Sequence, residues 1–344
     1  MKLTLLLFAS LVSAFAQYSV QNDNGIVRLV DGKAETVVSI MPTHGNNAFR
    51  MTVRGHDILR YPYKSDEEFR TQDTFAGIPF LWPWANRLDD TAFYANGKKY
   101  ALNMDLGVVR GQPGSHPMHG FLTTATQWQI VEAKADASSA WIISKLDFYK
   151  QPNWMAEFPF AHTVEMTYRL KDGALEMSVK VDNLSTDPMP LSIGFHPYFQ
   201  LTDSPRDEWT FGIAAKTNWV LAPDKIPTGV TRPIEEFLPK PQGSTLKGLN
   251  LDDVFSDLVR DPSGKATMWV QGKSQRLDVT FGPKFRSVVV YSPGGAGNDY
   301  ICFEPMAGIT DSMNLAQKGL YRELQYVAPG QSWQEGFSIK PSGF

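Results

Sequence analysis

The chain has 344 residues, of which 42% are hydrophobic and 20% are charged, a balance typical of a globular protein with a large core. A formal net charge of −3 argues against a general electrostatic attraction to nucleic acid or to an anionic membrane. Cys302 is the single cysteine, which excludes an intramolecular disulfide and a cysteine-based metal site.

The first 16 residues have the pattern of a cleaved signal peptide. Lys2 supplies a positive start, residues 3–12 are almost continuously apolar, and Ala14-Phe15-Ala16 is a small-x-small cleavage site. The apolar run is shorter than the ~20 residues of a membrane-spanning helix, and no longer apolar run follows, which disfavours an uncleaved anchor. We therefore expect a mature chain that begins at about Gln17 and is periplasmic or extracellular, without a membrane segment.

Short alternating or apolar segments predict strands along most of the chain. Asn96-Gly97, between two such segments, is the dipeptide favoured in a type I′ hairpin turn. Prolines exclude a helix or a central strand at residues 75–86, and residues 203–248 are expected to form long loops between short strands. We expect strands at residues 26–30, 36–40, 93–95, 99–102, 128–146, 160–170, 174–183, 191–196, 266–270, 276–281, 287–291 and 333–339.

The fold class follows from this pattern of strands. No long helical period, low-complexity linker or strong internal repeat divides the chain. The sequence therefore predicts an all-β fold, a large antiparallel β-sandwich, in which residues 17–344 form a single domain.

Glu304 lies in a segment that otherwise has the character of a buried strand. Side chains alternate along a strand, so Tyr300, Cys302 and Glu304 share one face. Ile301 and Phe303 lie on the opposite face. Burying a carboxylate is costly unless another group pairs with it or uses it. The next residue, a proline, is expected to end the strand ladder and to leave Glu304 at a strand mouth. A solvated strand edge is the simpler alternative for such a residue on its own.

Two histidines have the surroundings of functional residues. His119 is followed by Gly120, which allows close backbone approach, and His196 ends an alternating segment on a small, polar face together with Ser192. Metal binding is disfavoured because the sequence has no His-x-x-x-His pair or compact His/Asp cluster, so we expect no metal. A serine hydrolase is disfavoured because no Gly-x-Ser-x-Gly elbow appears. Of the other histidines, His116 stays open, and structural or surface roles are expected for His44, His56 and His162.

Six motifs lie along the chain in a fixed order: Asn86-Arg87, the Asn96-Gly97 hairpin, Met118-His119-Gly120, Gly194-Phe195-His196-Pro197-Tyr198-Phe199, Leu251-Asp252-Asp253-Val254-Phe255 and Phe303-Glu304-Pro305. Taken together, these motifs resemble the aldose 1-epimerases, also called galactose mutarotases. The resemblance extends over nearly the whole mature chain and in the family's order. It implies a large antiparallel β-sandwich that binds a sugar on a concave sheet face and needs no cofactor.

The resemblance also implies roles for individual residues. Glu304 would be the general base that takes the proton of the sugar C1 hydroxyl, and His196 would be the general acid at the ring oxygen. His119 and Arg87 would hydrogen-bond the sugar. Asp252 would match the family's hydroxyl-binding aspartate, although the register leaves the adjacent aspartate as an alternative. A monosaccharide is the implied partner, and the oligomeric state stays open.

Two departures from the galactose mutarotase pattern bear on the substrate. Phe121 replaces a second glycine after His119-Gly120, and Gly77-Ile78-Pro79 with Trp82-Pro83 also resembles the hexose-6-phosphate 1-epimerases. Those proteins carry a phosphate-binding arginine shortly after His-Gly-Phe, whereas the next residues here are Leu122-Thr123-Thr124. We therefore expect a free hexose of the glucose or galactose type. A hexose-6-phosphate 1-epimerase and a non-catalytic carbohydrate-binding protein are the alternatives.

The aromatic residues near these motifs have two possible uses. Trp82, Trp84, Tyr198 and Phe199 could stack on the apolar face of a sugar, or they could pack in the core. A carbohydrate-binding protein without catalysis would keep such aromatics and lose the acid/base pair.

Overall fold

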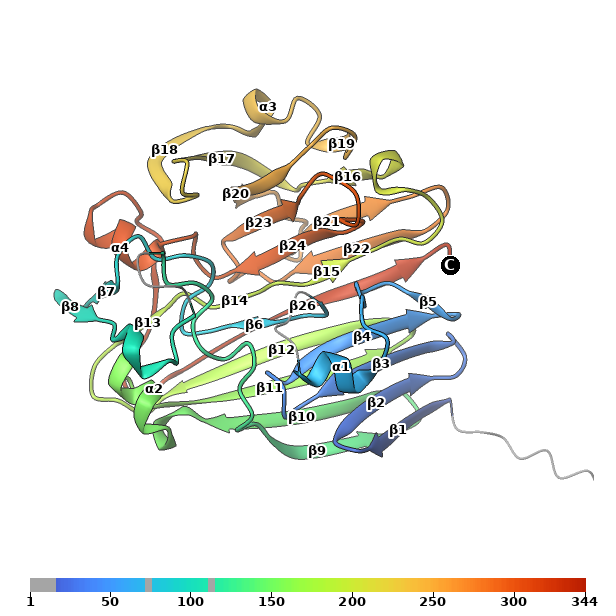
Figure 1. The fold of residues 1–344 in the computed structure, drawn as a ribbon, viewed down its shortest axis with the longest axis horizontal. Coiled ribbons are helices and arrows are strands. Elements are labelled where there is room, and N and C mark those ends of the chain that lie inside the picture. The colour runs from blue at the N-terminus through green and yellow to red at the C-terminus, as the bar shows by residue number, and fades with distance from the viewer. Residues whose placement is uncertain (1–16, 72–75, 111–114) are drawn as a thin grey trace, which may run out of the picture.

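The computed structural model describes residues 17–71, 76–110 and 115–344. The expected signal peptide, residues 1–16, lies outside these residues, as do residues 111–114 in the loop before His119. Antiparallel strands dominate the described chain and form five sheets, three of them large (Figure 1). The predicted all-β sandwich is confirmed, and the helices are short.

The three large sheets take their strands from different parts of the sequence. The five-stranded sheet runs in chain order: β1 (Tyr18–Asp23), β2 (Ile26–Asp31), β3 (Thr36–Met41), β4 (Asn47–Val53) and β5 (His56–Asp57). The nine-stranded sheet has the order β19 (Gln242–Thr245), β16 (Thr210–Gly212), β21 (Ala266–Gln271), β22 (Arg276–Phe281), β26 (Ser332–Ser342), β12 (Ala174–Asn183), β11 (His162–Lys171), β10 (Ala140–Asp147) and β9 (Gln129–Ala135).

The eight-stranded sheet carries most of the residues that the motifs single out. Its strands are β18 (Pro227–Pro233), β17 (Ala215–Leu221), β20 (Leu251–Leu258), β23 (Ser287–Ser292), β24 (Ile301–Met306), β14 (Gly194–Phe195) and β6 (Phe80–Leu81), with β15 (Tyr198–Phe199) also paired to β24. Two small sheets pair β13 (Met189–Leu191) with β25 (Gln325–Val327), and β7 (Ala92–Ala95) with β8 (Lys98–Ala101).

The helices are all peripheral or lie in connections. They are α1 (Asp66–Thr71), α2 (Pro152–Glu157), α3 (Ile234–Phe237) and α4 (Ser312–Gln317). No helix in the described ranges has the length and apolar character needed to cross a bilayer.

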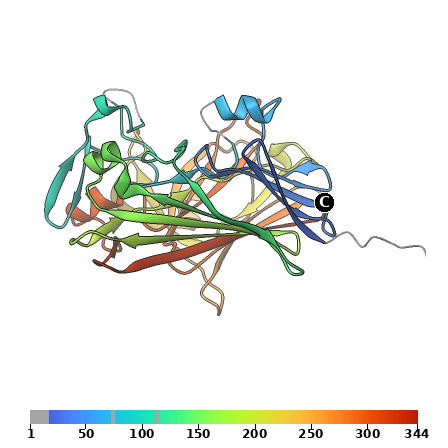
Figure 2. The same ribbon diagram turned by 90° about the horizontal axis from the view of Figure 1, so that it is seen from below.

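The sheets form two layers around one core. Figure 2 shows the nine-stranded sheet as one layer, with strands of the other two large sheets above it. Side chains from all three, such as Val27 of β2, Val164 of β11 and Phe255 of β20, belong to a single cluster of buried residues. The alternation predicted for residues 174–183 is the inward packing of β12, whose bounds match the expected ones. Burial of this shared apolar surface holds the layers together.

Three sequence expectations can be compared directly with the fold. The Asn96-Gly97 hairpin is confirmed, since these residues join β7 to β8 with positive φ at both positions. The short strands expected at residues 203–248 are confirmed as β16 to β19, although the connections between them are shorter than the expected long loops. The expectation that Pro305 ends its ladder is wrong: β24 continues to Met306, and Pro305 pairs with Val288 of β23.

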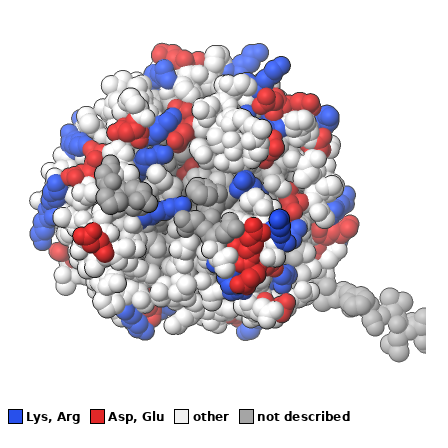
Figure 3. Space-filling model, in the orientation of Figure 1, with Lys and Arg blue, Asp and Glu red and all other residues white. Residues whose placement is uncertain are grey.

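The surface charges are mixed in sign. Figure 3 shows Lys and Arg interspersed with Asp and Glu over the visible face. This distribution agrees with the small net charge of the sequence.

Candidate active site

The register of the eight-stranded sheet decides which side chains share the face of Glu304. Ile301 and Phe303 point into the main core, so Glu304 points to the opposite face of β24. The alternation predicted for Ile301, Phe303 and Glu304 is confirmed. Two rows of side chains cross β20, β23 and β24 on this face: Asp252, Tyr291 and Cys302 in one, and Val254, Val289 and Glu304 in the next.

His196 completes the row of Glu304. It lies between β14 and β15, the two short strands that pair with β24 on the side away from β23. The backbone N–H of His196 donates to the carbonyl of Pro79 at 2.9 Å, which anchors this segment. His196 Nε2 lies 3.2 Å from Glu304 Oε1, and the imidazole stacks on the Tyr198 ring with centroids 4.4 Å apart. The two residues expected to be acid and base are thus in direct contact.

His119 approaches from a separate turn that docks on the segment preceding Arg87. Its N–H donates to the carbonyl of Asn86 at 2.8 Å, and the imidazole meets that of His196 edge-on with centroids 5.5 Å apart. His119 and Gly120 both have left-handed backbone, with φ of 62° and 60°. A Cβ on Gly120 would lie 2.0 Å from the carbonyl oxygen of Trp82, so the close approach requires glycine here.

Arg87 and Asp252 form an ion pair beside this cluster. Arg87 Nη2 lies 3.4 Å from Asp252 Oδ2, and Arg87 Nη1 donates to Asn86 Oδ1 at 2.9 Å. Asp252 shares the face of Glu304, whereas the adjacent Asp253 points to the other face of β20. Geometry therefore favours Asp252 over Asp253 as the aspartate of this cluster. All five expected site residues lie around one face of one sheet.

Burial dominates the electrostatics of the acid/base pair. It raises the pKa of Glu304 well above its usual range, and the negative charge of Asp252 adds to this rise while Arg87 opposes it. Burial likewise lowers the pKa of His196 to about 3, helped by the positive charges of Arg110 and Arg87. Apolar neighbours in the row and a nearly closed surface cause the desolvation. Burial therefore disfavours the charged pair, the Glu304 carboxylate with the His196 imidazolium, when no sugar is bound.

The pKa of His119 is also lowered well below its usual range. Burial is the main cause, and the charges of His196, Arg110 and Arg87 act in the same direction. Its Nδ1 atom and that of His196 have no hydrogen-bond partner in the described residues, and Glu304 Oε2 has none. Three polar atoms on three neighbouring residues are thus left without a partner in this part of the protein, which suits a site that binds a polar molecule.

Sequence reasoning missed some members of this site. Tyr291 lies in the row of Asp252, is part-buried, and meets the His196 ring with centroids 5.8 Å apart. Arg110, whose charge acts on both histidines, carries no motif of its own. The alternation of residues 287–291 gives the face of Tyr291, but only the strand register shows that this face is the face of Glu304.

Most of the four aromatic residues considered for sugar stacking pack in the core instead. Trp82, Trp84 and Phe199 are fully buried in the main core. Trp82 Nε1 donates to Nε2 of His162 at 2.8 Å, which also confirms the structural role expected for His162. Tyr198 is nearly buried and supports the His196 ring. Among these four, none offers an open ring face to a sugar.

His116, whose role the sequence leaves open, contacts an aspartate outside the acid/base pair. His116 Nε2 lies 3.1 Å from Asp224 Oδ2, so it joins its loop to the turn between β17 and β18. The structure therefore gives His116 a contact between two connections and does not bring it into the pair of His196 and Glu304.

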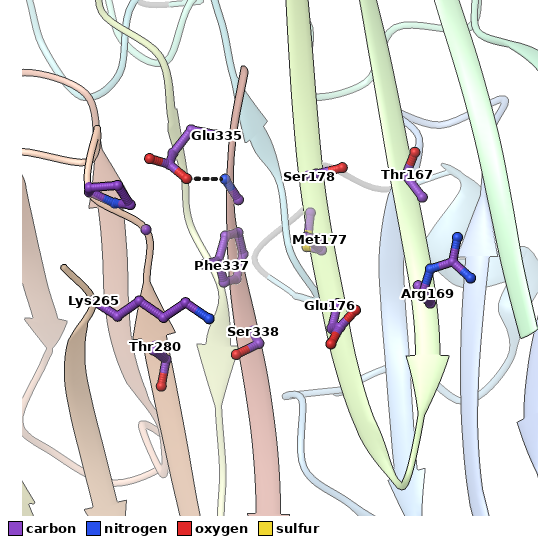
Figure 4. Close-up of a pocket in the computed structure, with 13 residues that line it drawn as sticks. Thr167, Arg169, Glu176, Met177, Ser178, Lys265, Thr280, Glu335, Phe337 and Ser338 are labelled. Atoms are coloured by element: carbon purple, nitrogen blue, oxygen red, sulfur yellow. Dashed lines mark hydrogen bonds between the residues drawn. The ribbon is translucent and has the colours of Figure 1, made fainter. Parts of the chain in front are cut away.

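A concavity lies on the outward face of the nine-stranded sheet, away from the acid/base cluster. It is a trough of about 370 Å³ with polar side chains from several strands, as Figure 4 shows. Opposite charges are mixed along it, among them Arg169, Glu176 and Lys265, and its lining includes no histidine. The trough therefore lacks the acid/base pair found on the eight-stranded sheet.

The acid/base cluster also differs from a metal centre. Within residues 17–71, 76–110 and 115–344, no group of three or more His, Cys, Asp or Glu side chains has an arrangement that could hold a metal ion. The chemistry available to the cluster is that of proton transfer and hydrogen bonding.

Similarity to known proteins supports a sugar epimerase. The chain matches the aldose 1-epimerase family over residues 29–340 and belongs to that family. Its fold is similar to that of a galactose mutarotase-like protein from Clostridium acetobutylicum, with a TM-score of 0.82 and 22% identity over 95% of this chain and 99% of that one.

Two further proteins extend the comparison. Galactose 1-epimerase from Lactobacillus acidophilus has a similar fold, with a TM-score of 0.73 and 13% identity over 95% of this chain and 98% of that one. The uncharacterized protein YihR of Escherichia coli K12 is 23% identical over 235 residues, which are 68% of this chain and 70% of YihR. The family and fold expected from the motifs are confirmed.

Proposed function

We propose that this protein is an aldose 1-epimerase that interconverts the α and β anomers of a free hexose of the glucose or galactose type. The observation that carries the proposal is the buried contact of 3.2 Å between His196 Nε2 and Glu304 Oε1. Arg87, Asp252 and His119 surround this contact with groups that can hydrogen-bond sugar hydroxyls. Membership of the aldose 1-epimerase family supports the reaction class.

The reaction needs one group to accept a proton while another donates one. With the sugar bound, the one proton of the pair lies on His196 and Glu304 is a carboxylate. Glu304 accepts the proton of the C1 hydroxyl, the bond between C1 and the ring oxygen breaks, and His196 gives its proton to the ring oxygen. The product is the open-chain aldehyde. Rotation about the C1–C2 bond presents the other carbonyl face, and the reverse proton transfers close the ring as the other anomer. Protons balance because the pair holds one proton throughout.

The electrostatics of the site favour the state that this scheme reaches after ring opening. At that point Glu304 is protonated and His196 is neutral. Burial favours the same two uncharged forms, because it raises the pKa of Glu304 and lowers that of His196. The site therefore opposes the charged pair that begins the reaction and favours the proton positions that accompany the open-chain sugar.

The choice between a free and a phosphorylated sugar rests on the cations. The arginine expected after His119-Gly120-Phe121 in the phosphate-binding relatives is absent, which favours a free hexose. Arg110, close enough to act on both histidines, is the observation that favours a sugar phosphate instead. We expect faster anomerisation of glucose and galactose than of glucose 6-phosphate.

Polarimetry of fresh α-glucose, α-galactose and α-glucose 6-phosphate, each with and without the purified protein, measures this preference. A much higher rate on the phosphate would reverse the assignment and identify Arg110 or another arginine as its ligand. Binding of all three sugars without acceleration would support the carbohydrate-binding alternative.

We also propose that the protein acts after export. The support is the positive, apolar and small-x-small pattern of residues 1–16. Expression of the full chain in a secreting host is expected to yield exported protein that begins at about Gln17. N-terminal sequencing of that material checks the cleavage, and an intact Met1 would contradict it.

A further inference from the structure

The turn that follows β24 contains a buried carboxyl with no part in the proton transfers described above. Asp311 lies seven residues after Glu304 and directly before α4, and only 1% of its surface is exposed. Its backbone is left-handed, with a φ of 60°. A carboxyl in such a place is costly unless it makes specific contacts.

Asp311 makes two hydrogen bonds to the backbone just after the Arg87 side chain, one on each side of Leu88. The N–H of Asp311 donates to the carbonyl oxygen of Arg87 at 3.1 Å. Asp311 Oδ1 accepts the N–H of Asp89 at 3.1 Å. One residue thus binds the chain on both sides of Leu88, immediately after the cation that pairs with Asp252.

A helix-capping role does not explain the Asp311 side chain. Asp311 occupies the N-cap position of α4, where an aspartate commonly accepts an N–H of the first helical turn. Its side chain makes no capping hydrogen bond. The carboxyl is turned instead toward Asp89, whose own carboxylate is held by Asn314 Nδ2 at 2.8 Å and by Lys318 Nζ.

We propose that Asp311 is a positioning residue that sets the place of Arg87 relative to Glu304. Asp311 and Glu304 lie on the same continuous, buried segment. The segment therefore holds Glu304 directly and holds Arg87 through the contacts of Asp311. This inference rests on the proposed function, in which Arg87 hydrogen-bonds the sugar. Loss of the Asp311 side chain should then weaken sugar binding through Arg87.

The raised pKa of Asp311 agrees with a positioning role that does not need a charge. Burial raises its pKa to about 8, the charge of Asp89 adds to the rise, and Lys318 opposes it. Near neutral pH the carboxyl is therefore mostly protonated, so it adds no full negative charge beside Asp89. Asparagine, which is neutral and has the same shape, should replace it well.

Two substitutions distinguish the loss of the hydrogen bond to the Asp311 side chain from a change in the backbone conformation of residue 311. Glycine adopts a left-handed φ without strain, so Asp311→Gly removes the acceptor for the Asp89 N–H and little else. Asp311→Asn keeps an acceptor oxygen and also tolerates this φ. We expect Asp311→Gly to raise KM for the hexose by roughly tenfold, the worth of a lost buried hydrogen bond, with a smaller effect on kcat. Asp311→Asn should restore KM to within about twofold of the wild type, since its oxygen accepts the same N–H.

A double-mutant cycle shows whether Asp311 acts through Arg87. Arg87→Ala alone should raise KM, and adding Asp311→Gly to it should raise KM little further, because the two changes remove the same interaction. The KM and kcat values come from anomerisation rates followed by NMR exchange, and thermal melting reports folding. If Asp311→Gly does not fold, Asp311→Ser, which is shorter, takes its place with the same expectation.

Three results would overturn the inference. An unchanged KM in folded Asp311→Gly removes the positioning role, and so does an equal increase in KM with and without the Arg87 side chain. If Arg87→Ala alone leaves KM unchanged, the role of Arg87 in the proposed function fails as well, which distinguishes the two failures.

Discussion

Replacement of Glu304 by glutamine is expected to lower turnover at saturating hexose by roughly 10²-fold or more, the usual contribution of a general base. Glutamine keeps the size of the side chain but cannot take the C1 hydroxyl proton. Sugar binding should largely survive, because a group that acts only in the transition state lowers kcat without weakening the ground state. Burial should not penalise glutamine either, since it already disfavours the charged form of Glu304 and raises the pKa of this carboxyl.

The matched control for this variant is Asp253→Asn. Asp253 is the carboxyl on the opposite face of β20, so its loss should leave turnover near that of the wild type. Anomerisation is followed by polarimetry, with thermal melting to show that each protein is folded. Near-normal turnover in folded Glu304→Gln would remove the base assignment. A large loss in Asp253→Asn would instead reopen the choice between Asp252 and Asp253.

The side-chain faces of this protein could be predicted from local alternation. Strand β12 has its expected bounds, and Ile301, Phe303 and Glu304 point as the period of two requires. These predictions succeed because each concerns one strand and its nearest neighbours. The hairpin at Asn96-Gly97 succeeds for the same reason.

Local rules failed where pairing with distant strands outweighs them. A proline lacks the N–H that a ladder uses, so Pro305 was expected to end β24. The strand instead lies between β23 and the short strands β14 and β15, and Met306 is still paired on both sides. The neighbours that hold β24 come from residues 194–199 and 287–292, and no local pattern shows that they meet.

In the candidate site, too, local patterns identify some residues, and others depend on contacts between distant segments. Glu304, His196 and His119 could be selected from their local surroundings together with the family resemblance. Tyr291, Arg110 and the contacts of Asp311 could not be predicted, because they depend on strand register and on the packing of one turn against another. Those pairings arise only when the sheets assemble.

His196→Asn is expected to lower turnover by about 10²-fold, because asparagine cannot give a proton to the ring oxygen. The Glu304→Gln/His196→Asn double variant tests whether the two residues act as a unit. Their atoms lie 3.2 Å apart and share one proton, so either substitution alone should disable the whole exchange. Residues that act as a unit show strongly non-additive losses.

We therefore expect the double variant to retain about the turnover of the weaker single variant, and not the roughly 10⁴-fold loss that two independent factors of 10² would give. NMR exchange at saturating hexose measures all three variants against the uncatalysed rate. A multiplicative loss would show that Glu304 and His196 contribute separately, and the single shared proton would then be the wrong description of this pair. A loss equal to that of one single variant would instead mean that the proton must pass through both side chains for either to assist ring opening.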